Sequence, residues 1–182
     1  MKFTPAAGLP GVWVVEPDVR RDARGFFFEA YSARFFKENG IGEVFVQDNH
    51  SLSRRGVLRG LHFQVEPHAQ AKLVSVLRGS AFDVVVDIRK ESGTFGRYAT
   101  EVLSAENRKT VYIPKGFAHG FLALEDDTHF LYKVSDFYSP AGQRGILWND
   151  PQIGIPWPAI EGGYLLSEKD KKNQTLETYR QS

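Results

Sequence analysis

The chain has 182 residues, of which 42% are hydrophobic, so it can bury one full core and falls in the size range of a single domain. Its 23 basic and 22 acidic side chains leave a formal net charge of +1, which excludes a strong overall field for nucleic acid or an anionic membrane. The absence of cysteine excludes a disulfide framework, a thiolate zinc site and a cysteine nucleophile.

Targeting signals are not evident in the sequence. The N-terminal residues lack a basic region followed by a long apolar run, and no apolar stretch approaches the ~20 residues of a membrane helix. We therefore expect a cytoplasmic protein with no membrane or nucleic-acid partner. We expect one domain over residues 1–182, with the C-terminal tail included.

Short segments with alternating apolar and polar residues recur between turns, as is typical of strands in an all-β protein. In chain order, the predicted strands cover 12–15, 43–47, 60–64, 73–77, 82–88, 98–103, 109–113, 120–124 and 130–134. In the clearest of these, residues 82–88, the alternation predicts that one face meets the core. The pattern favours a sandwich or a barrel.

Helices are few in this interpretation. Ser32 is predicted to cap a short helix over 33–39, and Ser167 is predicted to cap another that begins at Glu168. The polar tail over 169–182 is predicted to be a helix that frays, and residues 151–158 are predicted to wrap irregularly over the core.

Aromatic residues make up 13% of the chain and include 14 phenylalanines. Many of them lie in clusters such as 26–28 and 35–36. Since phenylalanine is most often buried, we expect most of these rings in the core, although exposed rings can stack on a base or a sugar.

Two of the five histidines stand out by their context. His62 lies in a strand-like run with Gly60, and His119 follows a Pro-x-Gly turn in an apolar strand. The two motifs resemble those of the cupin superfamily of double-stranded β-barrels. Metal-binding cupins hold a divalent ion with histidines and a glutamate, but here Gln64 takes one histidine position and the nearby Lys72 would repel a cation.

We therefore expect no metal and no other cofactor. The set His62, Glu66, His68 and His119 nevertheless remains an alternative reading as metal ligands.

A histidine and a lysine inside one barrel suit the removal of a proton next to a ketone. The reaction needs a base at the carbon and a positive group at the oxygen, where negative charge develops. His62 can be the base and Lys72 the oxyanion partner, while Tyr132 can be the acid on the opposite face. An ordinary core tyrosine explains Tyr132 equally well at this point.

Other charged residues are candidates for supporting roles. Asp83 and Asp170 can orient the histidines, and either can equally be a solvated surface charge. Arg24, Arg59 and Lys169 suit contacts to a diphosphate. There is no Walker loop and no GxGxxG run, so P-loop hydrolysis and dinucleotide-dependent hydride transfer lack support.

Taken together, the motifs resemble the dTDP-4-dehydrorhamnose 3,5-epimerase family. The resemblance covers nearly the whole chain, and only the tail beyond Lys171 matches weakly. It rests on the ordered blocks Asp22–Glu29, Phe45–Ser51, Val57–Gln64, Phe82–Arg89, Ile113–Phe121, Ile146–Asp150 and Leu166–Asp170.

The resemblance implies a cupin jelly roll, a homodimer, and inversion of C3 and C5 of dTDP-4-dehydro-6-deoxy-D-glucose. It implies that His62 is the base oriented by Asp170, that Tyr132 is the acid, and that Lys72 stabilises the enolate oxygen. His119 is then a sugar contact with Asp83 as its partner.

The family resemblance also implies a set of nucleotide contacts. The segment 24–29 is expected to serve the neighbouring subunit's site. Gln143 departs from the pattern, because relatives often carry glutamate there. The implied substrate contacts are Arg24, Phe26, Glu29, Gln47, Asn49, Arg59, His119, Asp83, Gln143 and Lys169.

Alternatives remain open at this stage. An epimerase that inverts only one carbon of a dTDP-4-keto-6-deoxysugar would use the same base and acid. A non-catalytic cupin or a metal-dependent cupin enzyme is a further alternative, which Gln64 and Lys72 disfavour.

Overall fold

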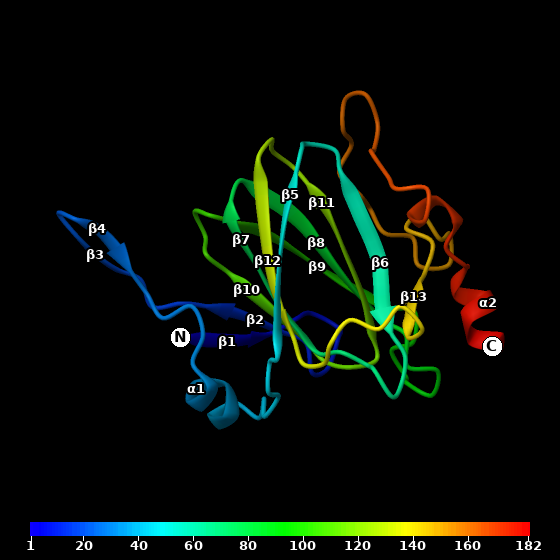
Figure 1. The fold of residues 1–182 in the computed structure, drawn as a ribbon, viewed down its shortest axis with the longest axis horizontal. Coiled ribbons are helices and arrows are strands. Elements are labelled where there is room, and N and C mark those ends of the chain that lie inside the picture. The colour runs from blue at the N-terminus through cyan, green and yellow to red at the C-terminus, as the bar shows by residue number, and fades with distance from the viewer.

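The computed structural model describes residues 1–182, and most of its regular structure is β-strand (Figure 1). In chain order the elements are β1 (Lys2–Pro5), β2 (Trp13–Glu16), β3 (Arg20–Asp22), β4 (Gly25–Phe27), α1 (Ala33–Glu38), β5 (Gln47–Ser53), β6 (Leu58–Gln64), β7 (Lys72–Arg78), β8 (Ser80–Asp87), β9 (Tyr98–Ser104), β10 (Thr110–Ile113), β11 (Phe117–Ala123), β12 (Thr128–Val134), β13 (Gln143–Gly145), the 3-10 turn η1 (Asp170–Lys172) and α2 (Leu176–Gln181).

Two antiparallel sheets form the body of the molecule. The six-stranded sheet has the order β1-β2-β10-β7-β12-β5, and the five-stranded sheet has the order β13-β6-β11-β8-β9. Apolar side chains from both sheets, among them Val74, Val85, Phe117 and Phe130, meet in a buried cluster between them. The predicted all-β fold of the cupin jelly-roll type with a few short helices is confirmed.

Strand β8 is buried on both of its faces. Val85 points into the space between the two sheets, while Val84 and Val86 pack against a second cluster that includes Ile146 and Leu176. The C-terminal part of the chain therefore covers the outer face of the five-stranded sheet, as Figure 1 shows at the right. This covering explains why β8 is apolar on both sides.

Some element boundaries differ from the sequence predictions. The strand predicted over 43–47 is wrong, because β5 begins at Gln47 and runs to Ser53. Its pocket-facing residues are polar, so the apolar alternation that marks other strands is missing.

The predicted C-terminal helix is also shorter than expected. Ser167 Oγ does accept the N–H of Asp170 at 3.1 Å, but only a single 3-10 turn follows. The helix in the tail, α2, begins later and is capped by the Thr175 hydroxyl, which accepts the N–H of Thr178. Residues 151–158 form no helix or strand, as predicted.

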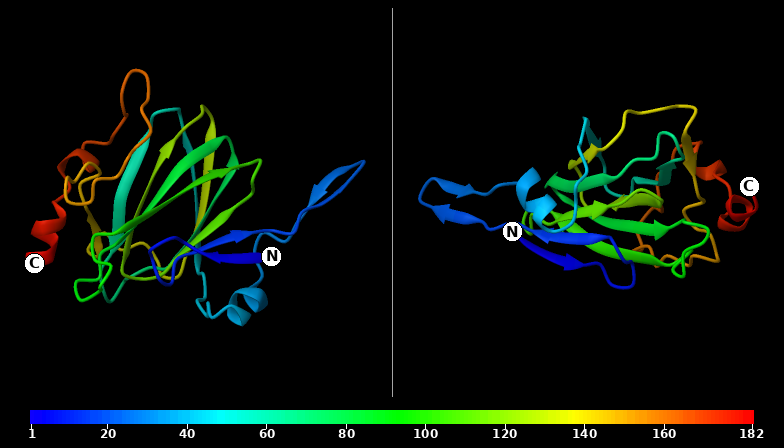
Figure 2. Two further views of the ribbon diagram at one scale, coloured as in Figure 1. Left: turned by 180° about the vertical axis from the view of Figure 1, so that it is seen from behind. Right: turned by 90° about the horizontal axis from the view of Figure 1, so that it is seen from below.

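Not all phenylalanine clusters belong to the core. Phe36, on α1, is buried, but Phe26 and Phe27 are 54% and 69% exposed. These two lie on the β3–β4 hairpin, which projects away from the body of the molecule (Figure 2). We call residues 20–29 the arm. The expectation that the 26–28 rings are core is wrong for Phe26 and Phe27, since neither ring joins a buried apolar cluster.

Strands β6 and β11 approach one another unusually closely at two glycines. A Cβ added at Gly60 would lie 2.6 Å from the Cα of Gly120, and Gly60 has a φ of +143°. The approach occurs beside an irregularity in the β6–β11 register, two residues before His62. Glycine is required here so that the strand carrying His62 can sit against β11.

We expect Gly60→Ala to lower the free energy of unfolding by about 1–3 kcal/mol, because the methyl group must displace backbone. Urea unfolding measures the change. Gly42→Ala is the matched control, since its Cβ would meet no atom within 4 Å. Equal midpoints for the two variants would contradict the close-approach argument.

Candidate active site

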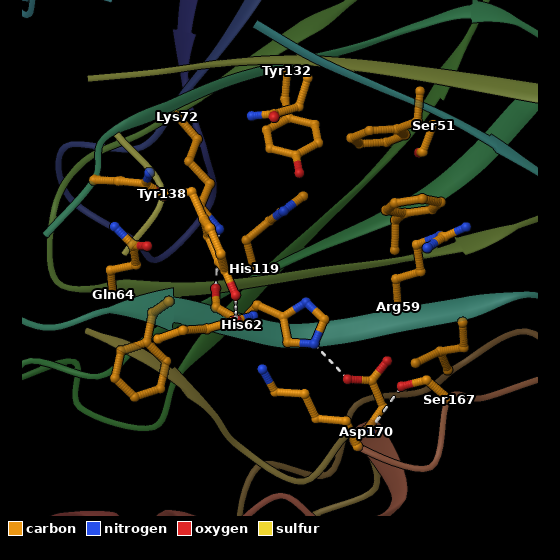
Figure 3. A pocket seen from close by; sticks show the side chains of 18 of the residues that line it. Ser51, Arg59, His62, Gln64, Lys72, His119, Tyr132, Tyr138, Ser167 and Asp170 are labelled. Atoms are coloured by element: carbon orange, nitrogen blue, oxygen red, sulfur yellow. Dashed lines mark hydrogen bonds and ion pairs between the residues drawn. The ribbon is translucent and has the colours of Figure 1, made fainter. Parts of the chain in front are cut away.

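A cavity opens at one end of the space between the two sheets and has a volume of about 540 Å³. It is lined by Gln47, Asn49, Ser51, Val57, Leu58, Arg59, His62, Phe63, Gln64, Gln70, Lys72, His119, Phe121, Phe130, Tyr132, Tyr138, Gln143, Leu165, Ser167, Lys169 and Asp170. The cavity thus brings together all four predicted catalytic residues (Figure 3).

His62 and Asp170 form a hydrogen-bonded pair on one wall of the cavity. His62 projects from β6, and its Nε2 lies 2.5 Å from Oδ1 of Asp170 in η1. Asp170 is only 3% exposed. Burial alone would raise the pKa of Asp170, but the hydrogen bond and charge of His62 outweigh it and hold that pKa below its usual value. The carboxylate therefore stays ionised and fixes the imidazole.

A second histidine–carboxylate pair lies deeper in the barrel. His119 on β11 is opposite His62 in the strand register, and its Nε2 is 2.6 Å from Oδ1 of Asp83 on β8. Both side chains are almost fully buried. Burial lowers the pKa of His119, although the Asp83 carboxylate opposes that effect. The predicted partnership of these two residues is confirmed as a contact.

Lys72 links the two sheets at the cavity. It begins β7 in the six-stranded sheet, and its Nζ donates to the backbone oxygen of His62 at 3.1 Å. Burial lowers the pKa of Lys72 to about 8, and the negative charge of Asp83 partly opposes this. An ammonium held at this depth is well placed to stabilise negative charge on a bound oxygen.

This pKa predicts a pH dependence. Since Lys72 loses its proton as the pH rises through about 8, we expect kcat/KM to fall above that pH. In Lys72→Arg the guanidinium stays charged, so the alkaline decline should move upward even where the maximal rate is lower. Steady-state rates from pH 6 to 10 for both proteins measure this, and an unshifted decline would remove Lys72 as its source.

Tyr132 faces His62 across the cavity. It lies on β12, and in Figure 3 its hydroxyl points into the cavity from the side opposite His62. Partial burial raises the pKa of Tyr132, while the positive charge of Arg59 opposes the rise. The phenol is thus protonated at neutral pH, as an acid must be, and Arg59 is placed to stabilise its anion.

The mouth of the cavity is polar. Gln47 and Asn49 extend inward from β5 and are hydrogen-bonded to each other at 2.8 Å. Tyr138, which the sequence analysis did not select, donates from its hydroxyl to Gln143 at 2.7 Å. A lone tyrosine before a Ser-Pro turn carries no recognisable motif, and only the fold brings it here. Ser51, Gln70 and Ser167 were missed for the same reason.

Four predicted contacts lie outside this cavity. Arg24, Phe26 and Glu29 are on the arm, where Arg24 is paired with Asp22 and highly exposed. The structure therefore does not bring them to the cavity of their own chain. Asp83 also does not line it, because it sits behind His119.

The alternative metal-ligand set is not assembled. Glu66 is exposed, and His68 pairs with Asp136 at 3.4 Å. No group of three or more His, Asp or Glu side chains is arranged to hold a metal ion. The chain also contains no helix with the length and apolar character needed to span a membrane.

Comparison with known proteins agrees with this geometry. Residues 6–178 match the sequence model of the family described as dTDP-4-dehydrorhamnose 3,5-epimerase. The enzyme of that name from Pseudomonas aeruginosa is 52% identical over 177 residues, which are 97% of this chain and 96% of that protein.

Solved structures give the same result. The rmlC epimerase of Mycobacterium tuberculosis is 40% identical, with a TM-score of 0.95 over 100% of this chain and 91% of that one. A dTDP-6-deoxy-D-glucose-3,5-epimerase from Legionella pneumophila in complex with dTDP-4-keto-L-rhamnose is 45% identical, with a TM-score of 0.92 over 97% of this chain and 93% of that one. The two histidines, each paired with an aspartate, converge with the lysine and the tyrosine on one cavity. Because the family model and these relatives match nearly the whole chain, this chain belongs to the dTDP-4-dehydrorhamnose 3,5-epimerase family.

Proposed function

We propose that this protein inverts C3 and C5 of dTDP-4-dehydro-6-deoxy-D-glucose and so forms dTDP-4-dehydro-L-rhamnose. The observation that carries the proposal is the opposed placement of His62, held by Asp170, and Tyr132, with Lys72 between the two sheets. The Legionella relative, with its bound dTDP-4-keto-L-rhamnose, supports the same substrate class. The cysteine-free sequence suits a cytoplasmic location for this reaction.

His62 acts as the base. Its Nε2 faces Asp170, which selects the tautomer with a proton on Nε2 and leaves the lone pair of Nδ1 free in the cavity. Nδ1 takes a proton from the carbon beside the C4 ketone, and the electron pair of that C–H bond moves into an enolate. The resulting imidazolium is stabilised by the Asp170 carboxylate.

Lys72 stabilises the enolate oxygen, where the negative charge collects. Tyr132 then gives its hydroxyl proton to the same carbon from the opposite face, and its oxygen becomes a phenolate near Arg59. Solvent at the open mouth of the cavity restores the proton of Tyr132 and removes the proton of His62. Repetition at the second flanking carbon completes the double inversion.

The decisive experiment is incubation with dTDP-4-dehydro-6-deoxyglucose in deuterated water without added metal. Deuterium at both C3 and C5 with inverted configuration is the expected result. Deuterium and inversion at one carbon alone would replace the proposal with a single-position epimerase. An absence of label would leave only a binding protein.

We also propose that the protein works as a homodimer in which the arm of each subunit completes the site of the other. The exposed Phe26 supplies a ring for stacking on a base, and Arg24 supplies a guanidinium for phosphate oxygens. The arm projects from the body instead of folding onto its own cavity, which supports delivery to a second copy (Figure 2). Dimerisation is then part of substrate binding.

Subunit complementation tests this arrangement. A variant with Arg24→Ala and Phe26→Ala lacks a working arm, and His62→Ala lacks the base. Each is expected to be inactive alone. After mixing under conditions that exchange subunits, one complete site should form in each mixed dimer, restoring roughly a quarter of the wild-type rate. An arm that serves its own chain would give no recovery.

A further inference from the structure

A short segment at the mouth of the cavity carries Tyr138. We call residues 135–139 the rim segment; it follows β12, the strand that bears Tyr132. The backbone N–H of Tyr138 donates to Oε1 of Gln47 at 3.3 Å, and its hydroxyl reaches Gln143. Tyr138 itself is 55% exposed, so its own packing does not fix its position.

The amide of Gln64 fastens this segment on both sides of Tyr138. Its Nε2 donates to the backbone oxygen of Phe137 at 3.2 Å and to that of His68 at 2.7 Å. Its Oε1 accepts the backbone N–H of Ser139 at 2.7 Å. Both amide hydrogens and the amide oxygen are therefore used, and the residue is only 7% exposed.

We call these three hydrogen bonds of Gln64 the clamp. Because Gln64 lies on β6, the clamp belongs to the same strand as the catalytic base. His62 and Gln64 are two residues apart on one strand, so their side chains share a face. Gln64 is also paired in register with Gln143, the partner of the Tyr138 hydroxyl. The strand that carries His62 thus holds the rim segment directly, through a side chain that the mechanism above does not use.

We propose that Gln64 is a positioning residue that holds Tyr138 over the cavity and thereby retains the substrate between the two inversions. The inference rests on the proposed function. A singly inverted intermediate either reacts again or dissociates, and the product ratio reports that competition. A rim segment freed from Gln64 favours dissociation, so the singly inverted product accumulates.

Two variants test the clamp. Gln64→Glu keeps the shape but removes both donors and sets a carboxylate oxygen against backbone carbonyls, while Gln64→Met keeps the volume without charge. We expect the ratio of singly to doubly inverted product, measured by deuterium content and NMR, to rise about tenfold in either, as for the loss of a hydrogen bond to a buried group. KM should rise more than kcat falls.

Asn107→Asp is the matched control. Asn107 is also a side-chain amide with three backbone hydrogen bonds, but it lies in the β9–β10 turn outside the cavity. It makes the same amide-to-carboxylate change, and we expect a wild-type product ratio. Thermal melting of all variants separates this effect from unfolding.

A double-mutant cycle with Tyr138→Ala decides whether Gln64 acts through Tyr138. We expect the ratio in Gln64→Met/Tyr138→Ala to equal that of Tyr138→Ala alone, since the clamp then has nothing to hold. Additive effects would overturn the proposal, as would folded Gln64 variants with the wild-type ratio. A wild-type protein that labels neither carbon would instead refute the proposed function itself.

Discussion

Replacement of His62 by alanine is expected to abolish deuterium incorporation at both carbons beside the ketone and to lower kcat by about 10²–10⁴-fold. The cavity holds no second imidazole able to take over, because His119 lies deeper and its Nε2 is engaged by Asp83 at 2.6 Å. The label in recovered substrate and product, read by mass spectrometry, measures proton removal directly.

His129→Gln is the control for this experiment. His129 is outside the cavity and contacts His50 at 3.0 Å, so it changes a histidine without touching the site. Its exchange rate should match that of wild type. Substantial exchange in a folded His62→Ala protein would remove His62 from its role as the base.

Replacement of Tyr132 by phenylalanine is expected to reduce inversion by about 10²–10³-fold while proton removal survives. The change deletes one hydroxyl and leaves the pair of His62 and Asp170 intact. Deuterium should therefore enter substrate that keeps its original configuration, because the base returns a solvent-derived proton to the face it came from. Configuration is read from NMR coupling constants and label from mass spectra of the same sample.

The comparison of the two rates is what makes this experiment informative. Equal losses of exchange and inversion in Tyr132→Phe would indicate a packing role for the ring. The melting temperature should change little, since Tyr132 is only partly buried and its hydroxyl has no protein partner that is lost.

Much of the site could be predicted because its chemistry lies on strands with strong sequence signals. His62 lies within a predicted strand, Lys72 directly precedes one, and His119 follows a Pro-x-Gly turn into a strand. The pairing of His62 with Asp170 joins residues 108 positions apart. The residues alone offered both Asp83 and Asp170 as partners for the histidines, and only the family resemblance assigned Asp170 to His62.

Other features depend on long-range packing that no local pattern encodes. The phenylalanines of the arm were predicted to be core residues because they are apolar. The sequence does not show whether other parts of the chain pack over them. Gln64 was selected only as a replacement for a metal ligand. Its three hydrogen bonds go to backbone groups, which the residue types in the sequence do not reveal as partners. Strand β5 was misplaced because its polar inward face resembles a loop.

Lys72 spans the gap between the sheets and is anchored on the carbonyl of His62 itself. The Lys72 side chain, which reaches from β7 to β6, therefore fixes the distance between the base and the oxyanion partner. The arm and the rim segment lie outside these two strands. Substitutions in the arm or the rim segment are therefore expected to alter substrate selection without moving Lys72 or His62. The residues that move protons keep their positions on the strands of the barrel.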